Sequence, residues 1–169
     1  MDGAPRMRLL LVLTFAAVVL AACHRREPKV SEKTIQSIHA SEPGMTDECL
    51  NTIRWGGVQA LHGQPEDCYK FDAPRRWKGL YFGEFEVSRF CPAPARQCSD
   101  TSPGEHIWLS ASSSAGVPAW NGKEASGLFA MEFIGHKTSY PGHYGHLGLS
   151  DEEIVIDHLI SMKQLERSP

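Results

Sequence analysis

The histidines near the end of the chain are the residues best suited to chemistry. The segment from residue 135 to residue 148 contains His136, His143 and His146, together with two tyrosines and four glycines, and His158 follows downstream. Neutral imidazole is a good ligand for zinc and copper, and His143 and His146 are three residues apart. With His136, His158 or an acidic residue from 151–153 as a further ligand, the segment gives the hypothesis of a zinc or copper site.

A structural turn is the alternative interpretation of the same segment, and we favour it. Its glycines allow tight folding, and a neutral imidazole can both donate and accept hydrogen bonds, so the histidines and tyrosines can hold the turn together. The His-Glu-x-x-His pattern of many zinc enzymes is absent from the sequence. We therefore expect no cofactor, with zinc or copper binding as the competing hypothesis.

Motifs for catalysis are missing elsewhere in the chain. Ser112, Ser113 and Ser114 lie in a Ser/Gly/Ala-rich stretch without the Gly-x-Ser-x-Gly frame of a hydrolase. Glu84 and Glu86 would lie side by side on one strand face, whereas glycoside hydrolysis needs carboxyl groups across a cleft. The sequence also has no phosphate-binding loop and no dinucleotide fingerprint. We predict that the protein is not an enzyme.

The N-terminal segment has the layout of an export signal. Arg6 and Arg8 precede an uncharged apolar run from residue 9 to residue 22, and Leu20-Ala21-Ala22 leads directly into Cys23. The run is shorter than the about 20 residues of a spanning helix. These residues resemble the lipobox of bacterial lipoprotein signal peptides. The resemblance implies that Cys23 carries fatty acyl chains such as palmitate and becomes the first residue of the mature chain.

The same resemblance implies a location and a partner. A lipid-modified Cys23 would hold the protein on a membrane of the cell envelope, on the periplasmic side. His24, rather than an aspartate, follows the cysteine, which favours the outer membrane over the inner membrane. An uncleaved N-terminal anchor and ordinary signal cleavage are the alternatives, and Met7 is a second candidate start.

The charge balance narrows the class of partner. The chain has 17 basic and 20 acidic residues and a net charge of −3. Nucleic-acid binding needs clustered Lys and Arg, so we expect no nucleic-acid partner. The expected partners are the membrane, through the lipid anchor, and an unknown envelope protein.

Four cysteines remain once Cys23 is assigned to lipid: Cys49, Cys68, Cys91 and Cys98. An even number of cysteines in an exported chain indicates disulfides, and four cysteines allow three pairings. We predict the sequence-adjacent pairing, Cys49 with Cys68 and Cys91 with Cys98. The alternative, a zinc–thiolate site, is disfavoured because the sequence has no Cys-x-x-Cys pair.

The remaining pattern predicts a mainly β domain. Strands are expected within residues 48–60, over 79–90 and 106–110, and over 128–135, where Phe129, Met131 and Phe133 alternate with other residues. Residues 154–162 are apolar enough for either a strand or a helix, and the β-branched run favours a strand. Ser31 could cap a short helix through Ile38.

These segments suggest a small antiparallel barrel or a sandwich. Residues 79–110, with Phe90-Cys91-Pro92 and Ile107-Trp108-Leu109, resemble small OB-like barrels of envelope lipoproteins, which implies an architecture and no activity. The expected division is a signal peptide (1–22, a signal helix), a flexible polar tether (23–43) and one β-rich globular domain (44–169). The expected function is a non-enzymatic structural or interaction role. Metal binding through residues 136–146 is the alternative, and an envelope hydrolase is the third hypothesis.

Overall fold

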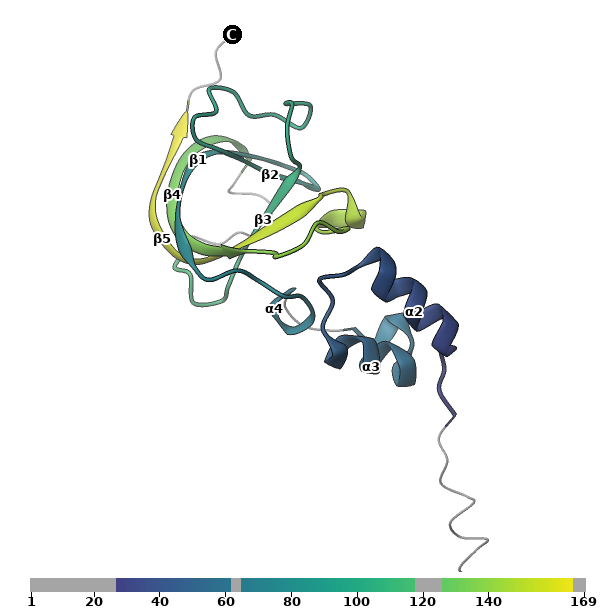
Figure 1. Ribbon diagram of the computed structural model, residues 1–169. Helices are drawn as coiled ribbons and strands as arrows, with labels where there is room; N and C mark the ends of the chain where they lie inside the picture. The colour runs from purple at the N-terminus through teal and green to yellow at the C-terminus, as the bar shows by residue number, and fades with distance from the viewer. Residues whose placement is uncertain (1–26, 62–64, 118–125, 166–169) are drawn as a thin grey trace, which may run out of the picture.

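A computed structural model describes residues 27–61, 65–117 and 126–165. The expected signal helix and the lipidation residue Cys23 lie outside these ranges. Within them, no helix combines the length and the apolar character needed to cross a membrane. The described chain forms a helical unit followed by a β-barrel (Figure 1).

The helical unit comprises α2 (Glu32–Ser41), α3 (Asp47–Gly56), the 3-10 turn η1 (Val58–Ala60) and α4 (Pro65–Cys68). Ser31 caps α2 as predicted, since its side chain accepts from the Thr34 N–H. The unit has its own apolar core, formed by Ile35, Met45, Cys49, Leu50 and Ile53. The Cys49–Cys68 disulfide joins α3 to α4, which confirms the predicted pairing.

Two expectations for this region are wrong. Residues 32–41 were expected to belong to a flexible tether, but Ile35 is 3% exposed and packs against α3, so α2 is part of the folded unit. The strand expected within residues 48–60 is the helix α3. Thr46 accepts from the Cys49 N–H at its start, and acidic residues occupy the first turn, where the helix dipole favours them.

The barrel has five strands: β1 (Arg75–Glu84), β2 (Val87–Pro92), β3 (Ile107–Ala111), β4 (Gly127–Lys137) and β5 (Glu152–Leu165). The strand order is β1-β2-β3-β5-β4, and β1 also pairs with β4 to close the barrel. This confirms the expected mainly β, OB-like fold. It is not wholly antiparallel, because β3 and β5 run parallel.

The long strand expected over residues 79–90 is a hairpin. Glu84 pairs with Val87 across a two-residue turn, Phe85-Glu86, and Tyr81 pairs with Phe90. Within β1, the alternating apolar residues Leu80 and Phe82 suggest a core-facing side, but both are only partly buried. Trp77 and Tyr81, on the other face of β1, are the buried residues.

Large side chains fill the barrel interior. The core includes Trp77, Tyr81, Phe90, Leu109, Phe129, Met131, Phe133, Ile154 and Ile156. The predicted alternation in β4 is confirmed, and the ambiguous segment at 154–162 is strand, as favoured. Because the interior is packed, any ligand site of this barrel has to lie on its outer face or its loops.

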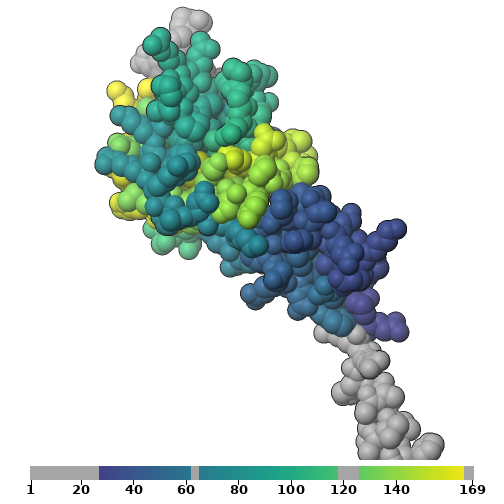
Figure 2. Space-filling view, in the orientation of Figure 1, coloured from purple at the N-terminus to yellow at the C-terminus, as the bar shows by residue number. Residues whose placement is uncertain are grey.

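The β4–β5 loop, residues 138–151, joins the barrel to the helical unit. It contains the 3-10 turn η2 (His146–Gly148). Ser139 donates its N–H to the Lys70 carbonyl at 2.8 Å, and the rings of Tyr69 and Tyr144 meet edge to face at 4.9 Å. Figure 2 shows this loop, in lime, in contact with the helical unit, in blue.

Candidate functional site

Three of the four candidate metal ligands, His136, His143 and His146, contact carboxylates, and no two of them share the same one. Nδ1 of His143 lies 2.6 Å from Oε1 of Glu42, at the end of α2. Nε2 of His146 lies 3.7 Å from Oε2 of Glu86, in the β1–β2 turn. His158 is exposed on β5, where it lies opposite Ile134.

His136 lies on the outer face of β4. Its Nδ1 is 2.9 Å from Oδ2 of Asp157, and its Nε2 is 4.0 Å from Oε1 of Glu66. Its ring packs edge to face against Phe71, with centroids 4.7 Å apart. The imidazole therefore links α4 and residue 71 to β5.

The ligands of the competing zinc or copper hypothesis do not converge among the described residues. In the part of the chain that the structure describes, no three side chains of the His, Cys, Asp or Glu type gather where they could hold a metal ion. Gly145 separates His143 from His146 with a φ of 70°, and the turn directs the two rings to different carboxylates. His143 and His146 are therefore close in sequence, but their rings do not point to a common position.

The acidic candidates for a third ligand are engaged elsewhere. Oδ2 of Asp151 accepts from the His106 N–H at 3.2 Å. Glu152 pairs with Lys137 at 2.5 Å. Glu153 accepts a hydrogen bond of 2.6 Å from Ser110.

The histidine-rich segment is instead a folded turn around Tyr144. This side chain is 2% exposed, and its hydroxyl donates to the Tyr140 carbonyl at 2.9 Å. Burial raises the pKa of Tyr144 to about 12. Gly145 lies directly on the Trp108 indole, because a Cβ at this position would come within 2.4 Å of the ring.

A buried polar layer separates α4 from the barrel. Glu153, on the outer face of β5, is 4% exposed. The pKa of Glu153 is raised to about 7, chiefly by burial and also by the charge of Glu66, while the hydrogen bond from Ser110 acts in the opposite direction. Oε2 of Glu66 is itself buried without a hydrogen-bond partner. With Glu66 nearby, a negative charge on the buried Glu153 side chain is unfavourable.

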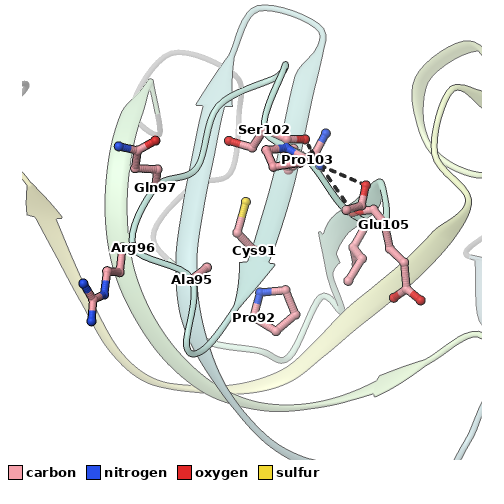
Figure 3. A pocket seen from close by; sticks show the side chains of 11 residues that line it. Cys91, Pro92, Ala95, Arg96, Gln97, Ser102, Pro103 and Glu105 are labelled. Carbon is pink, nitrogen blue, oxygen red and sulfur yellow. Dashed lines mark hydrogen bonds between the residues drawn. The ribbon is translucent and has the colours of Figure 1, made fainter.

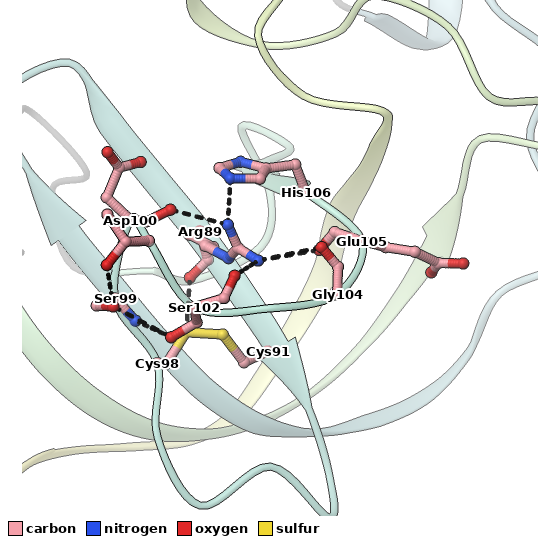
Figure 4. Close-up of a disulfide and its surroundings, with 10 residues drawn as sticks. Arg89, Cys91, Cys98, Ser99, Asp100, Ser102, Gly104, Glu105 and His106 are labelled. Atoms are coloured by element: carbon pink, nitrogen blue, oxygen red, sulfur yellow. Dashed lines mark hydrogen bonds between the residues drawn. A yellow bond between two sulfur atoms is a disulfide. The ribbon is translucent and has the colours of Figure 1, made fainter.

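The outer face of β2 is covered by the β2–β3 loop, residues 93–106. The Cys91–Cys98 disulfide closes the first part of this loop, which confirms the second predicted pairing. Arg89 lies beside it, 2% exposed, and its guanidinium holds the rest of the loop by its backbone (Figure 4). The guanidinium donates to four backbone carbonyl oxygens, those of Asp100, Ser102, Gly104 and Glu105.

Arg89 also contacts Nε2 of His106. Burial lowers the pKa of Arg89 from its ordinary value, while the charges of Asp100 and Asp151 raise it. A pocket of about 490 Å³ lies between this loop and the strands (Figure 3).

No family model, curated protein or solved structure matches this chain.

Large apolar side chains are exposed on two neighbouring loops. Phe85, at the tip of the β1–β2 hairpin, is 84% exposed. Leu147 and Leu149, in and beside η2, are 80% and 73% exposed. The His146–Glu86 contact brings the two loops together. We call these three residues the apolar loop surface.

Neither Arg89 nor the apolar loop surface was expected from the sequence. Phe85 falls inside the single strand expected over residues 79–90, because the turn Phe85-Glu86 lacks the glycine or asparagine typical of two-residue hairpins. The signal for Arg89 was its place two residues before Cys91 on one strand face, where the disulfide draws a loop over both side chains.

Proposed function

We propose that this protein is a lipid-anchored cell-envelope protein that binds another envelope protein and catalyses no reaction itself. The N-terminal pattern ending at Cys23 supports the anchor, with the outer membrane as the favoured membrane. Two disulfides support folding in an oxidising compartment such as the periplasm.

The observation that carries the binding role is the apolar loop surface. Exposed apolar residues are common singly, but three on two adjoining loops are typical of an interaction site. The neighbouring charged group Glu86 and the chain's net charge of −3 disfavour an anionic bilayer as the occupant. A protein with an apolar contact face fits both observations.

The anchor is tested by metabolic labelling with an alkyne fatty acid. We expect the wild type to be labelled and to sediment with membranes, and Cys23→Ala to lose the label. An unlabelled wild type would overturn the lipid anchor.

The binding role is tested by placing a photo-cross-linking amino acid at Phe85 in the intact envelope. We expect one discrete product with an envelope protein, lost when Leu147→Ser and Leu149→Ser are added. The matched control carries the cross-linker at Ile160, on β5, which is 41% exposed. A product that survives the two leucine changes, or that forms equally from position 160, would contradict the proposal.

A further inference from the structure

The chain enters the folded protein at one end of the helical unit. The first described residues, in purple, lie at the end of this unit that faces away from the barrel (Figure 1 and Figure 2). The Val30 N–H donates to the Arg54 carbonyl at 3.2 Å, and Nη2 of Arg54 lies 3.1 Å from Oε2 of Glu32. The start of α2 and the end of α3 are therefore held together where the N-terminal segment begins.

This end of the molecule is close in sequence to the proposed lipid. Val30 follows Cys23 by seven positions. The two residues can therefore be at most about 25 Å apart, even if the chain between them is fully extended. An acylated Cys23 would lie at the bilayer surface, so the end of α3 would stay within that distance of the lipid.

Two apolar side chains are exposed just after Arg54. Trp55, in the last turn of α3, is 37% exposed, and Val58, in η1, is 62% exposed. The Trp55 indole N–H donates to Oδ1 of Asn51 at 3.0 Å, so the polar group of the ring keeps a partner when the ring leaves water. Tryptophan is enriched at membrane–water interfaces because it combines a large apolar ring with one polar group. These two side chains therefore suit the headgroup region of a bilayer.

The charge at this end is opposite in sign to that of the whole chain. Four basic and two acidic residues lie between positions 24 and 33, whereas the chain as a whole has a net charge of −3. Lys29 and Lys33 are exposed, and Lys33 lies in the first turn of α2. Basic residues beside a membrane anchor are attracted to anionic lipid headgroups. The charge therefore favours the same surface for the lipid as the exposed apolar side chains do.

We propose that the end of the helical unit formed by Lys29, Lys33, Trp55 and Val58 lies against the lipid bilayer that holds Cys23. The inference rests on the lipid anchor of the proposed function and adds an orientation to it. Trp55 and Val58 enter the membrane interface, and the two lysines contact lipid phosphates. The barrel then lies on the side of the helical unit away from the membrane, where its apolar loop surface is open to a protein partner.

The test is photo-cross-linking of the full chain in cells whose lipids carry radioactive phosphate. A photo-reactive amino acid at Val58 should give a protein band with a phosphate label that phospholipase C removes. The matched control carries the same amino acid at Ile160, an apolar residue of the barrel that is 41% exposed and should give no such band. A protein product in place of the lipid product at position 58, no product there, or equal lipid products from both positions would overturn the proposal.

Charge reversal tests the two lysines. Lys29→Glu and Lys33→Glu together should lower the lipid product from position 58 at least about fivefold, since each basic residue near an anionic surface contributes about that factor. An acidic residue is favourable in the first turn of a helix, so α2 should still form. Lys78→Glu and Lys163→Glu, the same change at exposed lysines of the barrel, should leave the product unchanged. Equal effects of the two pairs, or no effect of the first pair, would contradict the proposal.

Fatty-acid labelling of the same cells separates this inference from the proposed anchor. If the chain takes up the fatty acid but position 58 gives no lipid product, the anchor stands and the membrane contact of the helical unit is wrong. If position 58 gives the lipid product without fatty-acid uptake, the contact stands and the acyl anchor is wrong. Loss of both signals would overturn both.

Discussion

Glu42 holds His143 through both the ring and the backbone. Its Oε1 lies 2.6 Å from Nδ1, and its Oε2 accepts from the His143 N–H at 3.4 Å. Glu42 follows α2 and His143 lies in the β4–β5 loop, so this contact joins the helical unit to the barrel. A histidine that appears in the sequence as a metal ligand is thus engaged by a carboxylate 101 residues away.

His143→Ala should lower the free energy of unfolding by less than about 1 kcal/mol, because the His143 side chain is 70% exposed and solvent weakens the pair. Urea denaturation measures the change. Elemental analysis of wild type and variant should show no stoichiometric zinc or copper in either. Metal present in the wild type and lost in His143→Ala would restore the metal-site hypothesis.

The two disulfides should contribute unequally to stability. Cys49–Cys68 spans 19 residues and Cys91–Cys98 spans 7. In the chain-entropy account, the longer loop contributes about 3 kcal/mol and the shorter one about 1 kcal/mol less. Urea unfolding of the two double Cys→Ala variants compares them. If removing Cys91–Cys98 lowers the free energy of unfolding more than removing Cys49–Cys68 does, loop length is not the governing factor. The Arg89 contacts would then depend on the Cys91–Cys98 disulfide.

Glu153→Gln should stabilise the protein more at high pH than at low pH. Because the pKa of Glu153 is raised to about 7 in the folded state, the folded protein holds a proton that the unfolded chain has released. Wild-type stability therefore falls as the pH rises from the unfolded pKa to the folded one, and the glutamine variant lacks this loss.

The stability gained by Glu153→Gln, relative to wild type, should increase by on the order of 2 to 3 kcal/mol between about pH 5 and about pH 8. Urea denaturation at a series of pH values measures it. Glu105→Gln removes the same charge from an exposed position and should show no such dependence. Parallel curves for wild type and Glu153→Gln would mean that Glu153 is ionised normally.

Gly145→Ala should disrupt the turn that carries the histidines. Gly145 has a φ of 70°, and an added Cβ would come within 2.4 Å of the Trp108 ring. Gly104→Ala is the matched control, since Gly104 also has a positive φ, 101°, but open space around it. We expect Gly104→Ala to cost about 1 kcal/mol and Gly145→Ala at least about twice as much. Equal losses in thermal unfolding would show that the indole contact does not constrain the turn.

The parts of the fold that sequence analysis predicted are those with local signals. Alternation of Phe129, Met131 and Phe133 identified β4 because every second residue faces the core. The disulfide pairing followed from cysteines adjacent in sequence. The β1–β2 hairpin was missed because its turn gives no local signal. Phe85-Glu86 has no glycine, so the apolar pattern continues through the turn without a break.

The candidate site depended on contacts that leave no local signal. His146 meets Glu86 and His136 meets Asp157 only after the barrel has closed. The burial of Arg89 and Glu153 likewise comes from segments packed over the outer face of the barrel. The sequence indicates which histidines could do chemistry. Which carboxylates they contact depends on the strand order of the closed barrel.

The Cys49–Cys68 bond has a mechanical consequence. A pull applied to the chain from its N-terminal side passes through α2 to residue 49, crosses the sulfur bridge, and continues from residue 68 towards β1. The intervening residues, including most of α3, carry none of that load. Tension can therefore unwind α2 or strain the short connection into β1. It cannot lengthen the protein by extending the segment between Cys49 and Cys68.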